Sequence, residues 1–480
     1  MSPNEHARTS MDSVDAAWLH MDEPTNLMVV TICTIFDEPL DFGLLKSTVE
    51  RRLLPFARAR QRVVVVNGQP GWEPDQHFSL GYHVRRVGVP GGGDDAGLLE
   101  LISDMMSVPL DPAKPLWQIT LAERYGKGCA VITRLHHCIG DGVAIGRMLG
   151  GLLDESPTPG ESVPIRKRTK QPPQSPLAAL GAAIESIGAA MRTSESVLNN
   201  SWETVTHPDR ALDIAGRSVG AASKIALMPP DSRTVFKGAL SVEKRAAWTT
   251  PVPLAKVKAA GKLLGGTVND VMVSAMAGGL RRYLLARGQS AESLTVRGMM
   301  PVNLLPPGAA PSSGNHFGMV YVGLPVSIKA PADRIAAVQR ETAAIKSSPE
   351  AALGYGILSA MGVTPLGVEH AMLDLLCSRA TAVITNVVGP TATLYLCGKP
   401  VKRTVFWVPQ ASKLGLGLSI FSYAGHMHMG IASDAGLVPD AAALAAAVDA
   451  EIQDLVGAER AVGGTPAAKT RSQEAGRRQG

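Results

Sequence analysis

Apolar residues between positions 129 and 153 follow first a strand-like and then a helix-like pattern. Residues 129–135 form a short, mostly apolar run rich in β-branched side chains, which predicts a strand in a covered sheet. After residue 142, apolar side chains recur at the spacing of a helix buried along one face: Ile145, Met148, Leu149, Leu152 and Leu153. The pattern predicts a strand, continued by residues 136–137, that passes into a helix across residues 140–142.

The junction between this strand and this helix reads His136-His137-Cys138-Ile139-Gly140-Asp141-Gly142. A histidine, with an ordinary pKa near ~6.5, can take a proton from a hydroxyl or thiol around neutral pH and return it. Because neighbouring strand residues point to opposite faces, we expect one of His136 and His137 to act and the other to pack. Asp141 is expected to cap the helix or pair with an arginine and so to hold the loop. Gly142 allows a substrate to approach the backbone closely.

The paired histidines have blander interpretations. Taken alone, two histidines at a strand end are more typical of packed core residues, with Asp141 as a simple helix cap. The spacing from the pair to Asp141 and Gly142, in a strand-to-helix context, favours the catalytic interpretation. A metal site is disfavoured, because adjacent histidine side chains diverge and no cluster of thiols or carboxylates accompanies them.

The H-H-x-x-x-D-G heptapeptide, with further segments in the same order, resembles the bacterial wax ester synthase/acyl-CoA:diacylglycerol acyltransferase family of the coenzyme A-dependent acyltransferase superfamily. The further segments are residues 11–19, 24–26, 115–117, 267–271, 301–303, 314–315 and 386–390, and the resemblance covers about residues 10 to 455. Two positions depart from the family pattern. Leu305 stands where an arginine is common, with Arg297 as a conceivable substitute, and Cys138 stands where a small alanine is usual.

The resemblance implies an α/β fold of two chloramphenicol-acetyltransferase-like domains, each a mixed sheet flanked by helices, with the active site in a channel between them. It implies that His137 takes the proton of an acceptor alcohol, which attacks the thioester of a long-chain acyl-coenzyme A without a covalent acyl-enzyme. The expected product is triacylglycerol from diacylglycerol, or a wax ester from a fatty alcohol. No cofactor is expected beyond acyl-coenzyme A as co-substrate.

Three polar residues in the second half are candidates for substrate binding. Asn269 and Asp270 precede a long helical pattern, and their simplest role is helix capping. The resemblance adds a role at the substrate site. Asn386 terminates the apolar strand at residues 382–384, where its amide could support the thioester oxygen, line the channel, or simply form a turn.

Length and composition divide the chain. At 480 residues, 45% of them hydrophobic, it exceeds the size at which one core stops growing, so two domains are expected. We place an N-terminal acyltransferase domain at 1–154, a proline-rich crossover at 155–233 with a helix at 177–191, a C-terminal domain at 234–462, and a disordered tail at 463–480. Two long uncharged windows, at 380–398 and 414–433, are better interpreted as strands, the second as a hairpin turning at Ala424-Gly425.

Charge and cysteines narrow the setting. A net charge of +5 and 4% aromatic residues argue against a nucleic-acid surface, and five scattered cysteines imply neither a disulfide framework nor a zinc knuckle. Residues 1–13 lack the apolar core of a secretory signal, so we expect a cytoplasmic protein. The basic run at 166–170 is either a solvated linker or a contact for the inner membrane face or a lipid-droplet surface.

Two alternative functions stay open. One is another acyltransferase of the same superfamily, with a smaller acyl group or a carrier-bound thioester. The other is a catalytically silent lipid-binding homologue, suggested by Leu305 in place of the arginine. The match of Gly216-Arg217-Ser218-Val219-Gly220 to the serine-hydrolase motif is weak, because its flanks are linker and not a buried strand.

Overall fold

The strand predicted before the paired histidines lies at the centre of the first sheet. The computed structural model describes residues 8–140, 142–158, 225, 227–303, 317–346, 348, 350–361 and 366–462, and in it this strand is β7 (Gly128–His136), buried along its whole length. The sheet has five strands in the order β15-β2-β7-β6-β5. The other four are β2 (Val29–Phe36), β5 (Val84–Gly88), β6 (Trp117–Tyr125) and β15 (Arg403–Trp407). The prediction of a covered strand is confirmed.

Helices of the first half lie on this sheet or beside it. They are α1 (Ser13–His20), α2 (Phe42–Arg52), the 3-10 helix η1 (Ala57–Arg60), α3 (Leu80–His83), α4 (Asp95–Met106) and α5 (Gly142–Gly150). One sheet face packs on α4, through Leu98 and Ile102, while the opposite face is turned toward α2 and α5. A small separate sheet joins β1 (Thr9–Ser10), β4 (Gln69–Pro74) and β3 (Gln61–Val66).

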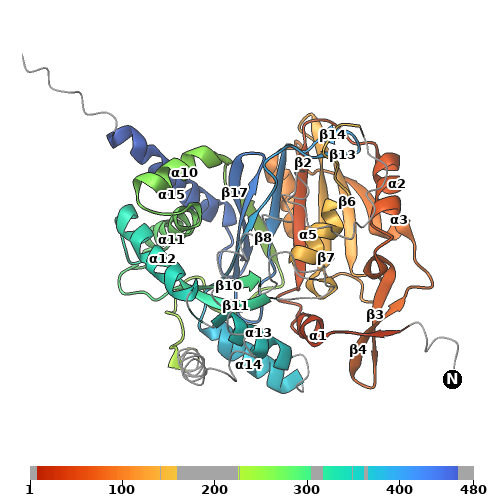
Figure 1. Cartoon of the computed structure of the whole chain (residues 1–480), viewed down its shortest axis with the longest axis horizontal. Coiled ribbons are helices and arrows are strands. Elements are labelled where there is room, and N and C mark those ends of the chain that lie inside the picture. Colours follow the sequence, from red (N-terminus) through yellow and green to blue (C-terminus); the bar gives the residue numbers. More distant parts are fainter. Residues whose placement is uncertain are drawn as a thin grey trace, which may run out of the picture.

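The second half is built on a seven-stranded sheet in the order β11-β10-β12-β16-β17-β8, with β9 paired to β17. Its strands are β8 (Lys244–Trp248), β9 (Val252–Pro253), β10 (Arg297–Asn303), β11 (Phe317–Gly323), β12 (Ala382–Val388), β16 (Leu416–Tyr423) and β17 (His426–Asp434). Its helices are α10 (Leu254–Leu263), α11 (Val268–Ala286), α12 (Pro331–Lys346), α13 (Glu350–Met361), α14 (Leu366–Ser378) and α15 (Ala441–Val462). Figure 1 shows the two halves side by side, the first in red to yellow and the second in green to blue.

The fold class and the hairpin follow the prediction. Both halves are sheets flanked by helices, and β16 and β17 pair antiparallel across Ala424 and Gly425, whose φ angles of 46° and 77° suit a tight hairpin turn. The window at 380–398 contains β12 and β13 (Tyr395–Leu396), and β13 pairs antiparallel with β14 (Lys399–Pro400) just beyond the window. Neither window is a helix.

One strand crosses from the second half into the first. β15 pairs antiparallel with β2, from Arg403↔Ile35 to Trp407↔Thr31, and so becomes the edge strand of the first sheet. A boundary drawn by sequence alone at residue 234 therefore does not separate the two sheets in space. The proposed helix at 177–191, most of the crossover, residues 216–220 and the tail at 463–480 lie outside the described residues.

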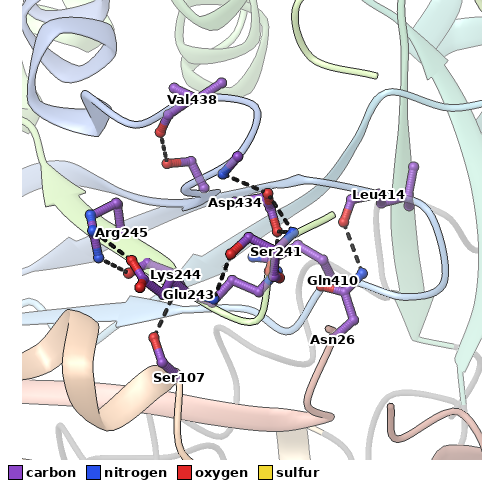
Figure 2. A network of polar contacts seen from close by, with 12 residues as sticks. Asn26, Ser107, Ser241, Glu243, Lys244, Arg245, Gln410, Leu414, Asp434 and Val438 are labelled. Carbon is purple, nitrogen blue, oxygen red and sulfur yellow. Dashed lines mark hydrogen bonds and ion pairs between the residues drawn. The ribbon is translucent and has the colours of Figure 1, made fainter. Parts of the chain in front are cut away.

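Besides β15, a network of polar contacts holds the two halves together (Figure 2). The Oγ of Ser107, at the end of α4, accepts a hydrogen bond of 2.9 Å from the backbone N–H of Lys244 on β8. The Lys244 ammonium donates to Asp434 Oδ2 on β17 at 2.7 Å, and both groups are buried. Asn26 Nδ2, after α1, donates to the carbonyl of Leu414 at 3.0 Å. These contacts join segments that are far apart in the sequence.

Candidate active site

His137 lies just beyond the end of β7. The pairing of β2 with β7 ends at Val29↔His136, so the strand stops there and His137 opens a 3-10 turn, η2 (His137–Ile139). The expectation that both histidines continue the strand is wrong by one residue, because β2 offers no partner beyond Val29 except the carbonyl of Met28. That carbonyl accepts the backbone N–H of His137 at 2.7 Å.

His136 is the packed member of the pair. It is 2% exposed, its Nδ1 accepts the backbone N–H of Cys138 at 3.2 Å, and its Nε2 lies 3.4 Å from Asp22 Oδ1. Burial lowers the pKa of the His136 imidazole, and the nearby Cys138 and Asp22 raise it by more. The N–H donated by Cys138 opposes a proton on Nδ1, so in the neutral ring the proton sits on Nε2, facing Asp22. Both ring nitrogens thus face protein atoms.

The His137 ring is half-buried and lines a cavity of about 320 Å³. The walls come from both halves: Val30, Ile32 and Thr34 of β2, Val131 and Thr133 of β7, and Leu149 near the end of α5 on one side, with Asn386 of β12 and Phe421 of β16 on the other. Among the described lining residues none is Lys, Arg, Asp or Glu, and the titratable side chains are His137 and Tyr423. The predicted channel between the two halves, with His137 on its wall, is confirmed.

Two aromatic rings bracket the His137 imidazole. The indole of Trp18 on α1 stacks on it, with ring centroids 4.1 Å apart and an interplanar angle of 17°. Phe317, the first residue of β11, lies with its ring centroid 5.8 Å away at 62°. Neither residue was assigned a role from the sequence. Trp18 does fall within the segment at 11–19 that carries the resemblance, and this was the one signal that could have found it.

The structure brings two of the predicted asparagines together. Asn386 lines the cavity and its Nδ2 donates to Oδ1 of Asn269, in the first turn of α11, at 2.9 Å. We expected Asn386 to terminate its strand, and this is wrong. β12 continues to Val388, because its parallel pairing with β16 extends to Val388↔Ser422. The pair links β12 to the start of α11 on the side of the cavity contributed by the second half.

Asp270 acts as a helix cap. Its Oδ2 accepts from the N–H and the hydroxyl of Thr267, at 2.9 and 2.7 Å, while the Thr267 hydroxyl accepts from the Asp270 N–H in a capping box. Thr342 donates to its Oδ1 at 3.3 Å. The carboxylate is buried and does not line the cavity, so the capping role is confirmed, while a role in substrate binding stays a prediction.

Two residues of the sequence argument, Asp141 and Leu305, lie outside the described part of the chain, so the roles expected of them stay predictions. Gly142 is described as the first residue of α5, and its closeness to substrate also stays a prediction. Whether Arg297 stands in for the arginine missing at position 305 stays a prediction, since that position is outside the described residues. The Arg297 guanidinium pairs with Asp231 at 2.7 Å at the opposite end of β10 from Asn303, about 20 Å away at ~3.3 Å per residue.

The fold and the site together define a class. Two sheets with flanking helices, a strand exchanged between them, and a histidine after the central strand that faces an apolar channel are the arrangement expected of a coenzyme A-dependent acyltransferase. Comparison with known proteins gives the family. Residues 11–272 match the wax ester synthase/diacylglycerol acyltransferase catalytic domain, and residues 313–456 match the C-terminal domain of the same proteins. The chain belongs to this family, and it is an acyltransferase.

Relatives and solved structures agree with this assignment. A probable diacylglycerol O-acyltransferase of Mycobacterium tuberculosis H37Rv is 27% identical over 459 residues, which cover 93% of this chain and 95% of the relative. The wax ester synthase/diacylglycerol acyltransferase of Marinobacter aquaeolei VT8 shares the fold, with a TM-score of 0.65 and 20% identity over 94% of this chain and 100% of that one. The first condensation domain of the CDA synthetase also shares it, with a TM-score of 0.54 and 15% identity over 94% and 96% of the chains.

Proposed function

We propose that this acyltransferase moves a long-chain acyl group from acyl-coenzyme A to the free hydroxyl of diacylglycerol, with fatty alcohols as a second class of acceptor. The observation that carries the proposal is the position of His137, a half-buried imidazole on the wall of a channel with apolar lining. A wall whose described residues are mostly apolar and carry no charged side chain favours hydrocarbon chains over small or charged acyl groups, because burying unpaired polar groups there would cost free energy. The diacylglycerol O-acyltransferase names of the relatives support the same acceptor.

In the proposed reaction, His137 takes the proton of the acceptor hydroxyl as that oxygen attacks the thioester carbonyl carbon. The C–O bond forms, the C–S bond breaks, and the thiolate of coenzyme A leaves. His137 then returns the proton to that sulfur, which leaves a neutral ester and a free thiol. His136 cannot share this task, because its ring nitrogens face Cys138 and Asp22. We propose that the Asn386–Asn269 pair supports the thioester oxygen from the second half.

We further propose that the acceptor is drawn from a lipid surface. In the part of the chain that the structure describes, no helix is long and apolar enough to cross a membrane. Three large apolar side chains of α14 are each at least 50% exposed and could contact lipid: Leu366, Val368 and Leu375. The basic run at 166–170 lies outside the described residues, so its predicted contact with an anionic membrane face stays a prediction.

A thiol-release assay with palmitoyl-coenzyme A tests the function. The acceptors are diacylglycerol, hexadecanol and short alcohols, and the variants are His137→Ala and His136→Ala. We expect His137→Ala to lower turnover by about 10² to 10⁴ with acyl-coenzyme A binding retained, and His136→Ala to reduce stability more than turnover. Full turnover in His137→Ala would refute the role of this imidazole. A preference for short or carrier-bound acyl donors would favour the other acyltransferase class, and acyl-chain binding without thiol release would favour a silent lipid-binding protein.

A further inference from the structure

The first helix of the chain ends up directly over the proposed catalytic base. Trp18 of α1 is 9% exposed and lies nearly parallel to the His137 ring, at a centroid distance of 4.1 Å. Its Nε1 is buried and has no hydrogen-bond partner in the described residues. A buried tryptophan usually pairs its N–H, so a ring needed only for packing would be served as well by phenylalanine.

The segment that follows α1 fastens this helix to the histidine on several sides. The Met28 carbonyl accepts the His137 N–H, and the Met28 N–H donates to Asp22 Oδ1 at 2.6 Å. Farther out, Asn26 is 1% exposed, and its Nδ2 donates to the carbonyls of Ser412 and Leu414 at 2.6 and 3.0 Å. Figure 2 shows the last of these contacts reaching into the second half. Residues 22–28 therefore hold α1 and η2 in a common frame.

The stacking has a consequence for the reaction. When His137 takes the proton of the acceptor it becomes an imidazolium, and a cation over the face of an indole is stabilised by the negative face of the ring. This stabilisation grows when water is excluded, as it is at a mostly buried indole. It is present only once the proton has moved, so it lowers the barrier and leaves ground-state binding almost unchanged. The same contact restricts rotation of the imidazole about its side-chain bonds.

We infer that Trp18 is a positioning residue for the acyl transfer, which orients His137 and stabilises the imidazolium that forms on it. The inference rests on the proposed function, because it needs His137 to be the base. It gives the segment at 11–19 a task at the active site, where the sequence alone indicated only a resemblance to the family.

The test is steady-state thiol release with palmitoyl-coenzyme A and diacylglycerol, using the full chain with Trp18→Leu and Trp18→Phe. We expect Trp18→Leu to lower kcat about tenfold, equivalent to about 1.4 kcal/mol in the barrier, with KM for acyl-coenzyme A changed less than about twofold. Trp18→Phe should recover only part of the lost kcat, because phenylalanine keeps an aromatic face but binds a cation less strongly than an indole does. Added to His137→Ala, Trp18→Leu should cause no further loss, because Trp18 acts through that ring.

Trp248→Leu is the matched control. Trp248 is 8% exposed, its ring lies tilted at 35° against Trp407 with centroids 6.0 Å apart, and it does not line the cavity, so it reports the cost of removing a buried indole elsewhere. Equal losses of kcat in Trp18→Leu and Trp248→Leu at equal thermal stability would overturn the inference, as would a rise in KM alone. If His137→Ala is inactive while Trp18→Leu keeps its kcat, only this inference fails. If His137→Ala stays fully active, the proposed function fails first.

Discussion

Three residues spaced along one face of β2 are expected to set the length of the acyl chain that the cavity accepts. Val30, Ile32 and Thr34 line the cavity, while Thr31, Cys33 and Ile35 face away from it. Since Val29 pairs with His136, Val30 is the nearest of the three residues to His137 and Thr34 is the farthest. At ~3.3 Å per residue, the two lie about 13 Å apart along the strand. If the acyl chain of the donor runs along this face, a phenylalanine at each of the three positions should block the cavity at a different depth.

The expected size of the effect follows from how strongly apolar pockets distinguish substrates of different length. One methylene group changes the relative kcat/KM by about 10- to 200-fold, or ~1–3 kcal/mol. Thr34→Phe should lower kcat/KM for palmitoyl-coenzyme A at least about tenfold relative to octanoyl-coenzyme A. Ile32→Phe should move the preferred chain shorter by about 7 Å of depth, and Val30→Phe should impair all donors. Thr34→Val keeps the side-chain shape and serves as the control.

The assay is thiol release across a series of acyl-coenzyme A donors with four to eighteen carbons, at a fixed acceptor concentration. The ratio of kcat/KM values between donors cancels losses of folded enzyme, so a destabilised variant still gives a usable profile. An identical chain-length profile in all three variants would refute the placement of the donor chain along β2. It would assign this part of the cavity to the acceptor, which the same series run with alcohols of different lengths would then reveal.

Two predictions concern buried charges. Asp434→Ala should destabilise the protein by about 3–5 kcal/mol, because it leaves the buried Lys244 ammonium without its carboxylate partner. In thermal unfolding, the double variant with Lys244→Met should recover part of this loss. Equal melting temperatures for the wild type and Asp434→Ala would contradict the prediction. Burial, together with the charge of Arg403, lowers the pKa of His428 to about 4. Between pH 6.5 and 4 the unfolded chain therefore binds more protons at this residue than the folded one. The free energy of unfolding should consequently fall by up to about 3 kcal/mol as the pH is lowered through this range. His428→Leu should flatten this dependence, and an unchanged slope in melts from pH 7 to 4.5 would assign it to other groups.

Local periodicity predicted the elements whose pattern is carried by neighbouring residues. β7, α5 and the β16–β17 hairpin all follow from short-range alternation and a turn at Ala424-Gly425. β15 was not predictable in its role, because a five-residue strand carries no information on which sheet it will join. Its pairing with β2 joins residues more than 360 positions apart. Long-range pairing of this kind is decided by the whole core and not by the pattern of the strand itself.

The same division holds within the site. The histidine motif and the polar character of Asn269 and Asn386 were visible in the sequence, whereas the contact between the two asparagines needed the fold. The predicted start of the helix was late by a few residues, since Asn269 and Asp270 were expected to precede α11, whereas they lie in its first turn and Thr267 is its N-cap. Trp18 lay in a segment that carried the resemblance and offered no chemistry of its own until the fold placed it against His137.

Strand alternation predicted that the two histidines diverge, but it could not say which of them faces the substrate. The start of β2 decides this. Because the ladder ends at Val29, the chain turns at His137, and the ring of His136 stays inside, where a backbone N–H and Asp22 meet its two nitrogens. A base must exchange its proton with substrate, and a ring whose nitrogens both face protein atoms pays for each exchange with a broken contact. Lengthening β2 by one paired residue would therefore be expected to pull His137 into the strand and to remove activity while leaving the motif intact.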